Sequence, residues 1–265
     1  MNILDQILAH KRTEVEERKR LYPVKLLENS PLFTTKTLSL KSFIQRNDKS
    51  GIITEFKRKS PSKGIINDQA SVERTTVGYA QAGASALSIL TDKNFFGGSN
   101  EDLLIAREHN LCPILRKDFT IDEYQIVEAK SIGADAILLI AAALEPDRVK
   151  QLASFAHSLA LEVLLEVHDK DELLGNLDAH VDLLGVNNRS LKTFEVSIDV
   201  SKTLAPLIPK NAVKVSESGI SDPETIVELR KYGYEGFLMG ENFMKHREPE
   251  VACKEFITRL NMLSK

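Results

Sequence analysis

The sequence predicts an α/β fold, a (β/α)8 barrel that follows a helical N-terminal extension, and three observations lead to this prediction. The chain has 265 residues, a usual length for one such barrel and long for most other single domains. Eight short apolar runs recur at intervals of roughly 21 to 36 residues, with helical patterns between them. Turns that begin with Gly83 and Gly133 lead from a helix end into a strand, and glycine accepts the left-handed helix terminus. We expect one barrel domain over residues 1–265, with residues 1–50 as the extension.

The extension is expected to contain one main helix. An apolar helical stripe is formed by Ile3, Ile7, Leu8 and Val15. Residues 11–20 are strongly charged. We expect this helix to lie across the barrel; the alternative is an arm that binds a partner. A further short helix is expected within residues 38–46.

The eight apolar runs are the predicted barrel strands. Most are rich in Ile, Leu and Val without strict alternation, as expected for strands buried on both faces. They are residues 52–56, 86–90, 113–116, 136–140, 163–166, 183–186, 213–215 and 236–239. A doubly wound open sheet is the alternative fold, but such a sheet usually has fewer strands and a GxGxxG turn, which is absent here.

Helical periodicity occupies four of the segments between these strands. The predicted helices are residues 101–109, 123–132, 145–159 and 222–232. Asp222 before Pro223 is typical of an N-cap followed by proline at the first helical position.

The composition excludes several classes of protein. The net charge of −3 does not favour a nucleic-acid partner, for which a basic domain is expected. No run approaches the roughly 18 apolar residues of a membrane span. Acidic residues such as Asp5 and Glu14 are unlike a signal or transit peptide. We therefore expect no nucleic-acid or membrane partner, and a cytoplasmic location.

Neither the cysteines nor the histidines form a recognisable site. Two cysteines are too few for a disulfide framework, so Cys112 and Cys253 are expected to be packing residues. The six histidines form no HxH or HExxH spacing, and we expect no metal site.

Polar residues stand at the ends of most predicted strands. In chain order the residues at the strand ends are Glu55, Thr91, Lys117, Ala141, Glu166, Asn187, Glu217 and Gly240. In a barrel these residues converge on one mouth, where Lys57 from the first loop would join them. Carboxylates around lysines shift pKa values and support proton transfer. The alternative is that each residue merely ends its strand at the solvent boundary.

Two glycine-containing turns predict a phosphate site. Ser218 and Gly219 follow the seventh strand, and Gly240 and Glu241 follow the eighth. Phosphate sites of these barrels lie in the same two loops and use backbone N–H groups, which glycine allows to approach closely. Two ordinary turns are the alternative.

Aromatic and basic side chains complete the candidate site. Phe96 and Phe119 could form an apolar wall for a planar ligand, or could simply pack at the barrel rim. Arg189 could clamp a carboxylate with its guanidinium group, although this signal is weak alone.

Together these motifs resemble the indole-3-glycerol phosphate synthase family of tryptophan biosynthesis over nearly the whole chain. The matching segments are EFKRKSPS (55–62), LSILTD (87–92), FGGS (96–99), LRKDF (115–119), LEV (165–167), GVNNRSL (185–191), SESGI (216–220) and GENFM (240–244). Two positions vary: Glu241 stands where some members have a hydroxyl residue, and Arg116 where several have an apolar one.

The resemblance implies a lyase that needs no cofactor. Its substrate is 1-(2-carboxyphenylamino)-1-deoxyribulose 5-phosphate, which undergoes ring closure, decarboxylation and dehydration. Lys117 is then the candidate general acid and Glu166 the base, while Lys57 holds the substrate carboxylate or acts as a second acid. Glu55 orients a lysine, and Asn187 and Glu217 fix hydroxyl groups and the lysines. The substrate-binding residues are Ser60, Pro61, Leu90, Phe96, Phe119, Leu138 and Arg189.

The resemblance also implies a phosphorylated small molecule as the partner of a monomer, which can associate with other enzymes of the pathway. Three alternatives stay open. The barrel could be a phosphosugar isomerase, a Schiff-base aldolase with Lys117 as nucleophile, or a partner subunit without chemistry of its own.

Overall fold

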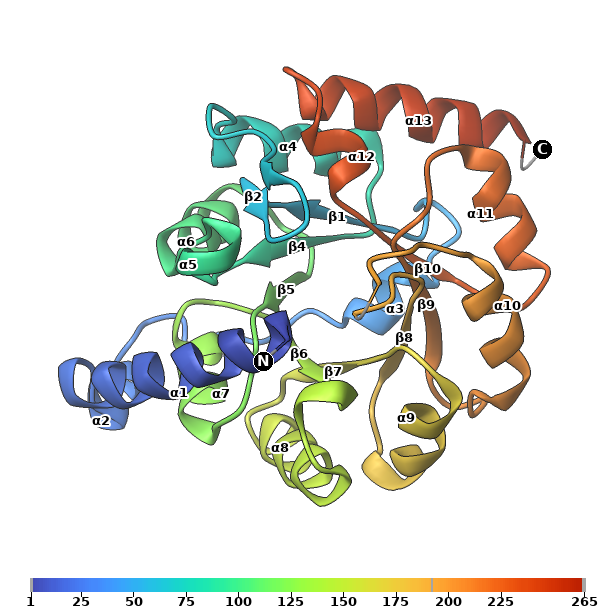
Figure 1. Cartoon of the computed structure of the whole chain (residues 1–265). Coiled ribbons are helices and arrows are strands. Elements are labelled where there is room, and N and C mark those ends of the chain that lie inside the picture. Colours follow the sequence, from blue (N-terminus) through green and yellow to red (C-terminus); the bar gives the residue numbers. More distant parts are fainter. Residues whose placement is uncertain (1, 192, 264–265) are drawn as a thin grey trace.

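The computed structural model describes residues 2–191 and 193–263, and within these residues eight parallel strands close into a barrel (Figure 1). The strands are β1 (Ile52–Phe56), β4 (Ala86–Leu90), β5 (Ile114–Lys117), β6 (Ala136–Ile140), β7 (Glu162–Val167), β8 (Leu183–Asn187), β9 (Val213–Glu217) and β10 (Gly236–Met239). Each barrel strand pairs with the next barrel strand along the chain, and β1 also pairs with β10 to close the ring. The barrel prediction is confirmed, and the open sheet is wrong.

The strands are buried on both faces, which explains why their sequences do not alternate. Side chains such as Ile53, Leu115 and Leu164 fill the barrel interior. Their neighbours along the strands, such as Ile52 and Leu165, pack outward into the layer between barrel and helices. The short helix α3 (Leu40–Ile44) joins the interior cluster, and the predicted helix within residues 38–46 is therefore confirmed.

Helices follow the strands and cover the outside of the barrel (Figure 1). They are α4 (Val72–Ala82), α6 (Asn100–His109), α7 (Glu123–Ser131), α8 (Pro146–Ser158), α9 (Lys170–Gly175), α10 (Asp199–Leu204), α11 (Pro223–Arg230) and α13 (Pro249–Leu263). The four helices predicted from periodicity correspond to α6, α7, α8 and α11 and differ from them only at their ends. Asp222 caps α11 by accepting the amide of Thr225, as predicted.

The extension forms α1 (Ile3–Leu21) and α2 (Val24–Glu28), and both pack against α7. A capping box between Asn2 and Asp5 begins α1. The apolar stripe predicted for this helix faces the barrel, and Ile7 is only 3% exposed. Unexpectedly, Lys11 on the same face is 1% exposed. The helix therefore brings a buried charge to the barrel as well as apolar side chains.

Several short elements lie in segments where the sequence had suggested only loops. The first loop folds into the hairpin β2 (Lys59–Ser60) and β3 (Gly64–Ile65). The helices α5 (Lys93–Phe96) and α12 (Glu241–Met244) follow β4 and β10. Both cysteines are buried and free, as predicted. Among the described residues, no helix combines the length and the apolar character needed to cross a membrane.

Candidate active site

A cavity of about 500 Å³ opens at the carboxyl ends of the barrel strands. The residues predicted for catalysis and binding all line it, although they are spread over residues 55–241 of the chain. They are Glu55, Lys57, Ser60, Pro61, Leu90, Phe96, Lys117, Phe119, Leu138, Glu166, Asn187, Arg189, Glu217, Ser218, Gly219, Gly240 and Glu241. The parallel barrel brings these residues together because all of its strands end at the same mouth.

Lys117, the last residue of β5, lies between two carboxylates. Its Nζ is 2.8 Å from Oε2 of Glu166 and 2.9 Å from Oε2 of Glu217. Burial alone would lower the pKa of Lys117, but these carboxylates outweigh it and raise that pKa. The side chain is therefore an ammonium ion at the wall of the cavity.

Glu166 on β7 is held from two further directions. Asn187 donates from Nδ2 to Oε1 of Glu166 at 3.0 Å. Nε2 of His168 lies 3.3 Å from the same oxygen, and Nδ1 of His168 lies 3.2 Å from Glu172. Burial raises the pKa of Glu166, but Lys117 and His168 outweigh it and hold that pKa well below its usual range. Glu166 is therefore an ionised base with a fixed orientation.

Glu217, at the end of β9, has a raised pKa, in contrast to the lowered pKa of Glu166. Burial, together with the nearby charge of Glu166, raises the pKa of Glu217 to about 7 even though Lys117 lowers it. Its Oε1 is buried and has no hydrogen-bond partner among the residues that the structure describes. Gly185 makes room for this oxygen, because a Cβ at that position would collide with it. Two carboxylates on one lysine thus differ in how readily they take up a proton.

Glu55 and Lys57 form a second ion pair at the mouth, with 2.7 Å between Nζ and Oε1. The Glu55 side chain packs closely against the backbone of Gly240, where a Cβ would lie only 2.6 Å from Oε1. The absence of a side chain at Gly240 therefore makes space for the carboxylate of Glu55 on β1, in addition to allowing the turn.

The predicted phosphate-binding turns follow the neighbouring strands β9 and β10, and both line the cavity. Ser218 and Gly219 both have positive φ, at 66° and 77°. Gly240 precedes α12 and lies in the other turn. The Glu241 carboxylate is 3.7 Å from Lys63 Nζ and 3.6 Å from Arg189. Cations from two loops therefore already meet an anionic group at this end of the cavity.

The opposite end of the cavity is apolar. Phe96 and Phe119 pack with ring centroids 5.9 Å apart. The extension adds Ile3, Leu4 and Ile7 from α1 to the cavity lining, and the sequence interpretation had not included these residues. Their apolar stripe was visible in the sequence, but only the docking of α1 shows that it reaches the cavity.

Two other polar residues near the site were also missed, His168 beside Glu166 and Asp118 beside Lys117. Asp118 follows the catalytic candidate directly, and a charged residue there could have been noticed. Among residues 2–191 and 193–263, no group of three His, Cys, Asp or Glu side chains is arranged to hold a metal ion.

Comparison with solved structures finds other barrels. Thiamine phosphate pyrophosphorylase from Pyrococcus furiosus aligns with a TM-score of 0.60 at 14% identity, over 86% of this chain and 100% of the other. A mutant tryptophan synthase α-subunit from the same organism aligns with a TM-score of 0.59 at 18% identity, over 81% and 99%. At such low identity these likenesses support the fold alone.

Comparison of sequences identifies the family. A curated relative from Bacteroides thetaiotaomicron named indole-3-glycerol phosphate synthase is 48% identical, over 97% of this chain and 98% of its own. Another of the same name, from Thermoanaerobacter pseudethanolicus, is 42% identical over 92% of each chain. The profile of that family matches residues 4–256. With its barrel, its cavity and these relatives, the chain belongs to the indole-3-glycerol phosphate synthase family.

Proposed function

We propose that Lys117 and Glu166 carry the proton transfers by which this chain makes indole-3-glycerol phosphate. Membership of the family makes it a carboxy-lyase of tryptophan biosynthesis. Its substrate is 1-(2-carboxyphenylamino)-1-deoxyribulose 5-phosphate. The observation that supports the assignment best is the ammonium group of Lys117 at the cavity, paired with two carboxylates of different pKa.

Ring closure requires an acid beside the ketone. The ring carbon that bears the carboxylate attacks the ketone carbon, and the ketone oxygen becomes negative. Lys117 gives this oxygen a proton, so that a hydroxyl group forms, and carbon dioxide then leaves and restores the aromatic ring. A positioned acid of this kind typically contributes about 10²–10⁴-fold to the rate.

Dehydration requires a base and a leaving hydroxyl group. Glu166 takes a proton from the new ring as the hydroxyl group leaves as water. The ammonium group of Lys117 or Lys57 protonates the leaving oxygen. The low pKa of Glu166 fits this role because the base must be ionised before it can act. Glu217 shares Lys117 with Glu166, and its pKa of about 7 lets it return a proton to the lysine after each transfer.

The remaining residues bind the two ends of the substrate. The turns at Ser218–Gly219 and Gly240–Glu241 hold the phosphate through backbone N–H groups. The aromatic end lies against Phe96 and Phe119, together with Ser60, Pro61, Leu90 and Leu138. Lys57, oriented by Glu55, holds the substrate carboxylate or acts as a second acid, and Arg189 supports the neighbouring loop.

A fluorescence assay tests the proposal directly. Purified protein is mixed with the carboxyphenylamino deoxyribulose phosphate, and indole emission is followed over time. The chain has no tryptophan, so any indole signal comes from product. Absence of product from folded protein would support a partner subunit without chemistry and would contradict the proposal.

Borohydride trapping separates this mechanism from a Schiff-base aldolase. A raised pKa keeps Lys117 protonated and makes it a poor nucleophile. We therefore expect no covalent adduct when substrate and borohydride are added together. A stable adduct on Lys117, found by mass spectrometry of the digested protein, would favour the aldolase chemistry instead.

Domain organisation, assembly and location are part of the same proposal. We infer one barrel domain over residues 1–265, with residues 1–50 as its extension, acting as a cytoplasmic monomer that can associate with other enzymes of the pathway. Sedimentation of the purified chain tests the monomer, since a sedimenting dimer would contradict it.

A further inference from the structure

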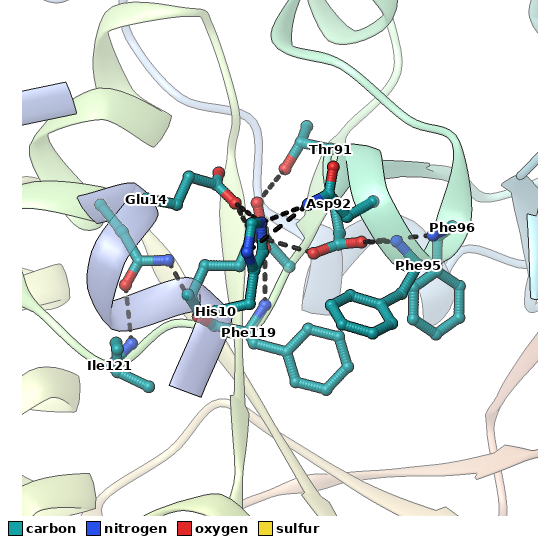
Figure 2. A network of polar contacts seen from close by, with 12 residues as sticks. His10, Glu14, Thr91, Asp92, Phe95, Phe96, Phe119 and Ile121 are labelled. Atoms are coloured by element: carbon teal, nitrogen blue, oxygen red, sulfur yellow. Dashed lines mark hydrogen bonds and ion pairs between the residues drawn. The ribbon is translucent and has the colours of Figure 1, made fainter. Parts of the chain in front are cut away.

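Lys11 of α1 is a buried cation outside the cavity. Its Nζ lies 2.9 Å from Oε2 of Glu14, 3.0 Å from Oδ2 of Asp92 and 2.9 Å from Oδ1 of Asp118. Asp92 is 0% and Asp118 3% exposed, so these two ion pairs are shielded from water. Figure 2 shows Glu14 and Asp92 converging on the centre of this network. A charge cluster of this kind has to be paired, because burying an isolated charge is costly.

Both aspartates also bind backbone amides of pocket residues. Oδ1 of Asp92 accepts the amides of Phe95 at 2.7 Å and Phe96 at 3.2 Å, and thereby caps α5. Oδ1 of Asp118 accepts the amide of Phe119 at 2.8 Å. Figure 2 shows Phe96, the last residue of α5, and Phe119, which follows β5, beside the network. Each carboxylate therefore fixes one turn that carries an aromatic ring of the cavity.

The second oxygen of Asp118 is also paired. Oδ2 accepts a hydrogen bond from Oγ1 of Thr91 at 2.5 Å and lies 3.5 Å from Arg116. The aspartate therefore cannot turn freely toward another partner, and Lys11 is held at a defined position. Through Lys11 the helix α1 is tied to the turns after β4 and β5.

We propose that Lys11 is a positioning residue for the aromatic end of the substrate. It holds α1 against the turns of Phe96 and Phe119, so that Ile3, Leu4 and Ile7 face these rings across one apolar pocket. Neither Lys11 nor Asp92 lines the cavity, and Lys11 therefore acts through the residues that do. This inference rests on the proposed function in assigning the apolar end of the cavity to the aromatic group.

The first test measures the turns without any ligand. Amide hydrogen exchange is compared in the unmodified protein, in Lys11→Met and in Lys19→Met. Lys19 is a matched control, since it lies on the same helix and pairs with Asp122 and Glu16 at the surface. We expect faster exchange at Phe96 and Phe119 in Lys11→Met only. Unchanged exchange at both amides would overturn the proposal.

The second test measures the two ends of the cavity separately. Anthranilate, followed by its own fluorescence, probes the apolar end, and inorganic phosphate probes the other. We expect Lys11→Met to weaken anthranilate binding about tenfold or more and to change phosphate binding less than about twofold. With the full substrate, KM should rise by more than kcat falls. Equal weakening of both probes would mean a merely structural role and would overturn the proposal.

A second variant covers loss of folding. Lys11→Met/Asp92→Asn removes one buried carboxylate together with the cation, so that less unpaired charge remains. If circular dichroism shows that Lys11→Met is unfolded, the double variant replaces it in both tests. If both are unfolded, Lys11 supports the whole barrel and the proposal is wrong. Failure of the unmodified protein to bind either probe would count against the proposed function. The role of Lys11 in binding the aromatic end of the substrate would then be wrong as well.

Discussion

Lys117 and Lys11 are both buried lysines among carboxylates, but the pKa values of the carboxylates differ between the two clusters. Around Lys11, the positive charges of Lys11 and Arg116 overcome burial and lower the pKa of Asp118 to about 2. Around Lys117, burial dominates for Glu217 and raises its pKa to about 7. Within the described part of the chain, Oε1 of Glu217 and Oδ2 of Asp92 both lack a hydrogen bond, but the Asp92 oxygen lies 3.0 Å from Lys11 Nζ, and both oxygens of Asp118 are bonded.

The difference shows what separates a reactive charge cluster from a structural one. The Lys117 cluster faces a cavity, and of its three charged members Glu217, with a pKa of about 7, is the one that can gain or lose a proton near neutral pH. The Lys11 cluster is covered by α1, and its carboxylates hold backbone amides. Residue types alone do not distinguish the two, since each combines one lysine with acidic partners from distant segments.

The largest expected effect is on turnover. Lys117→Met should lower kcat about 10²–10⁴-fold, because the proposed acid for ring closure is lost. Stability should change little, since Glu217 can take up a proton once the lysine is gone. Steady-state kinetics and urea unfolding measure both quantities. Near-normal turnover would remove Lys117 from the mechanism.

Lys11→Met, the matched substitution at the other cluster, should lower the free energy of unfolding far more than Lys117→Met does. Lys11→Met leaves Asp92 and Asp118 as buried charges without their cation, which costs about 3–5 kcal/mol of unfolding free energy. Urea unfolding at neutral pH compares it with Lys117→Met. If Lys117→Met lost as much stability as Lys11→Met, the distinction between the two clusters would be wrong.

Gly185→Ala tests the space around Glu217. The added methyl group would collide with Oε1 of Glu217, and overpacking of this kind costs about 1–3 kcal/mol. Displacement of Glu217 from Lys117 should lower kcat as well. Gly175→Ala is the control, because its Cβ would meet only Pro146, at 3.7 Å. Equal behaviour of the two variants in unfolding and kinetics would contradict this account of Gly185.

His168→Asn tests the pH dependence of the Lys117 cluster. Burial opposes protonation of His168, but Glu166 and Glu172 outweigh it and raise its pKa from 6.5 to about 10. Because the pKa of His168 is higher in the folded than in the unfolded state, its protonation stabilises the fold. This stabilisation is fully present below about pH 6.5 and is lost as the pH rises through about 10. The unmodified protein should lose on the order of 2 kcal/mol over this range, as for charge-assisted hydrogen bonds. Urea midpoints at several pH values should show a flatter profile in the variant, and parallel profiles would refute the assignment.

Glu241→Ser should have the smallest effect. The Glu241 carboxylate pairs loosely with Lys63 and Arg189. Under the proposed function it would compete with the substrate phosphate for these cations. Exposed pairs are worth about 0.2–1 kcal/mol, so the variant should show a KM lower by about two- to fivefold with unchanged kcat. A higher KM would mean that Glu241 assists binding rather than competing with phosphate.

The barrel, and the set of residues that meet at its mouth, could be predicted from the sequence. Short buried strands alternating with helices leave few topologies, and in a closed parallel barrel every strand ends at the same mouth. Glu55, Lys117, Glu166 and Glu217 could therefore be grouped without knowing where any side chain points. The same reasoning placed Gly219 and Gly240 in the turns after the last two strands of the barrel.

The pairing of charges and surfaces between distant segments could not be predicted from the sequence and depends on how the chain packs. Lys11 stands in a strongly charged run and would be expected in solvent, yet the docking of α1 buries it against Asp92 and Asp118. The pairing of His168 with Glu166 and the difference between Glu166 and Glu217 likewise depend on burial and on neighbours in space. Periodicity reports which face of an element is apolar, whereas electrostatic energy depends on distances that the packed chain alone sets.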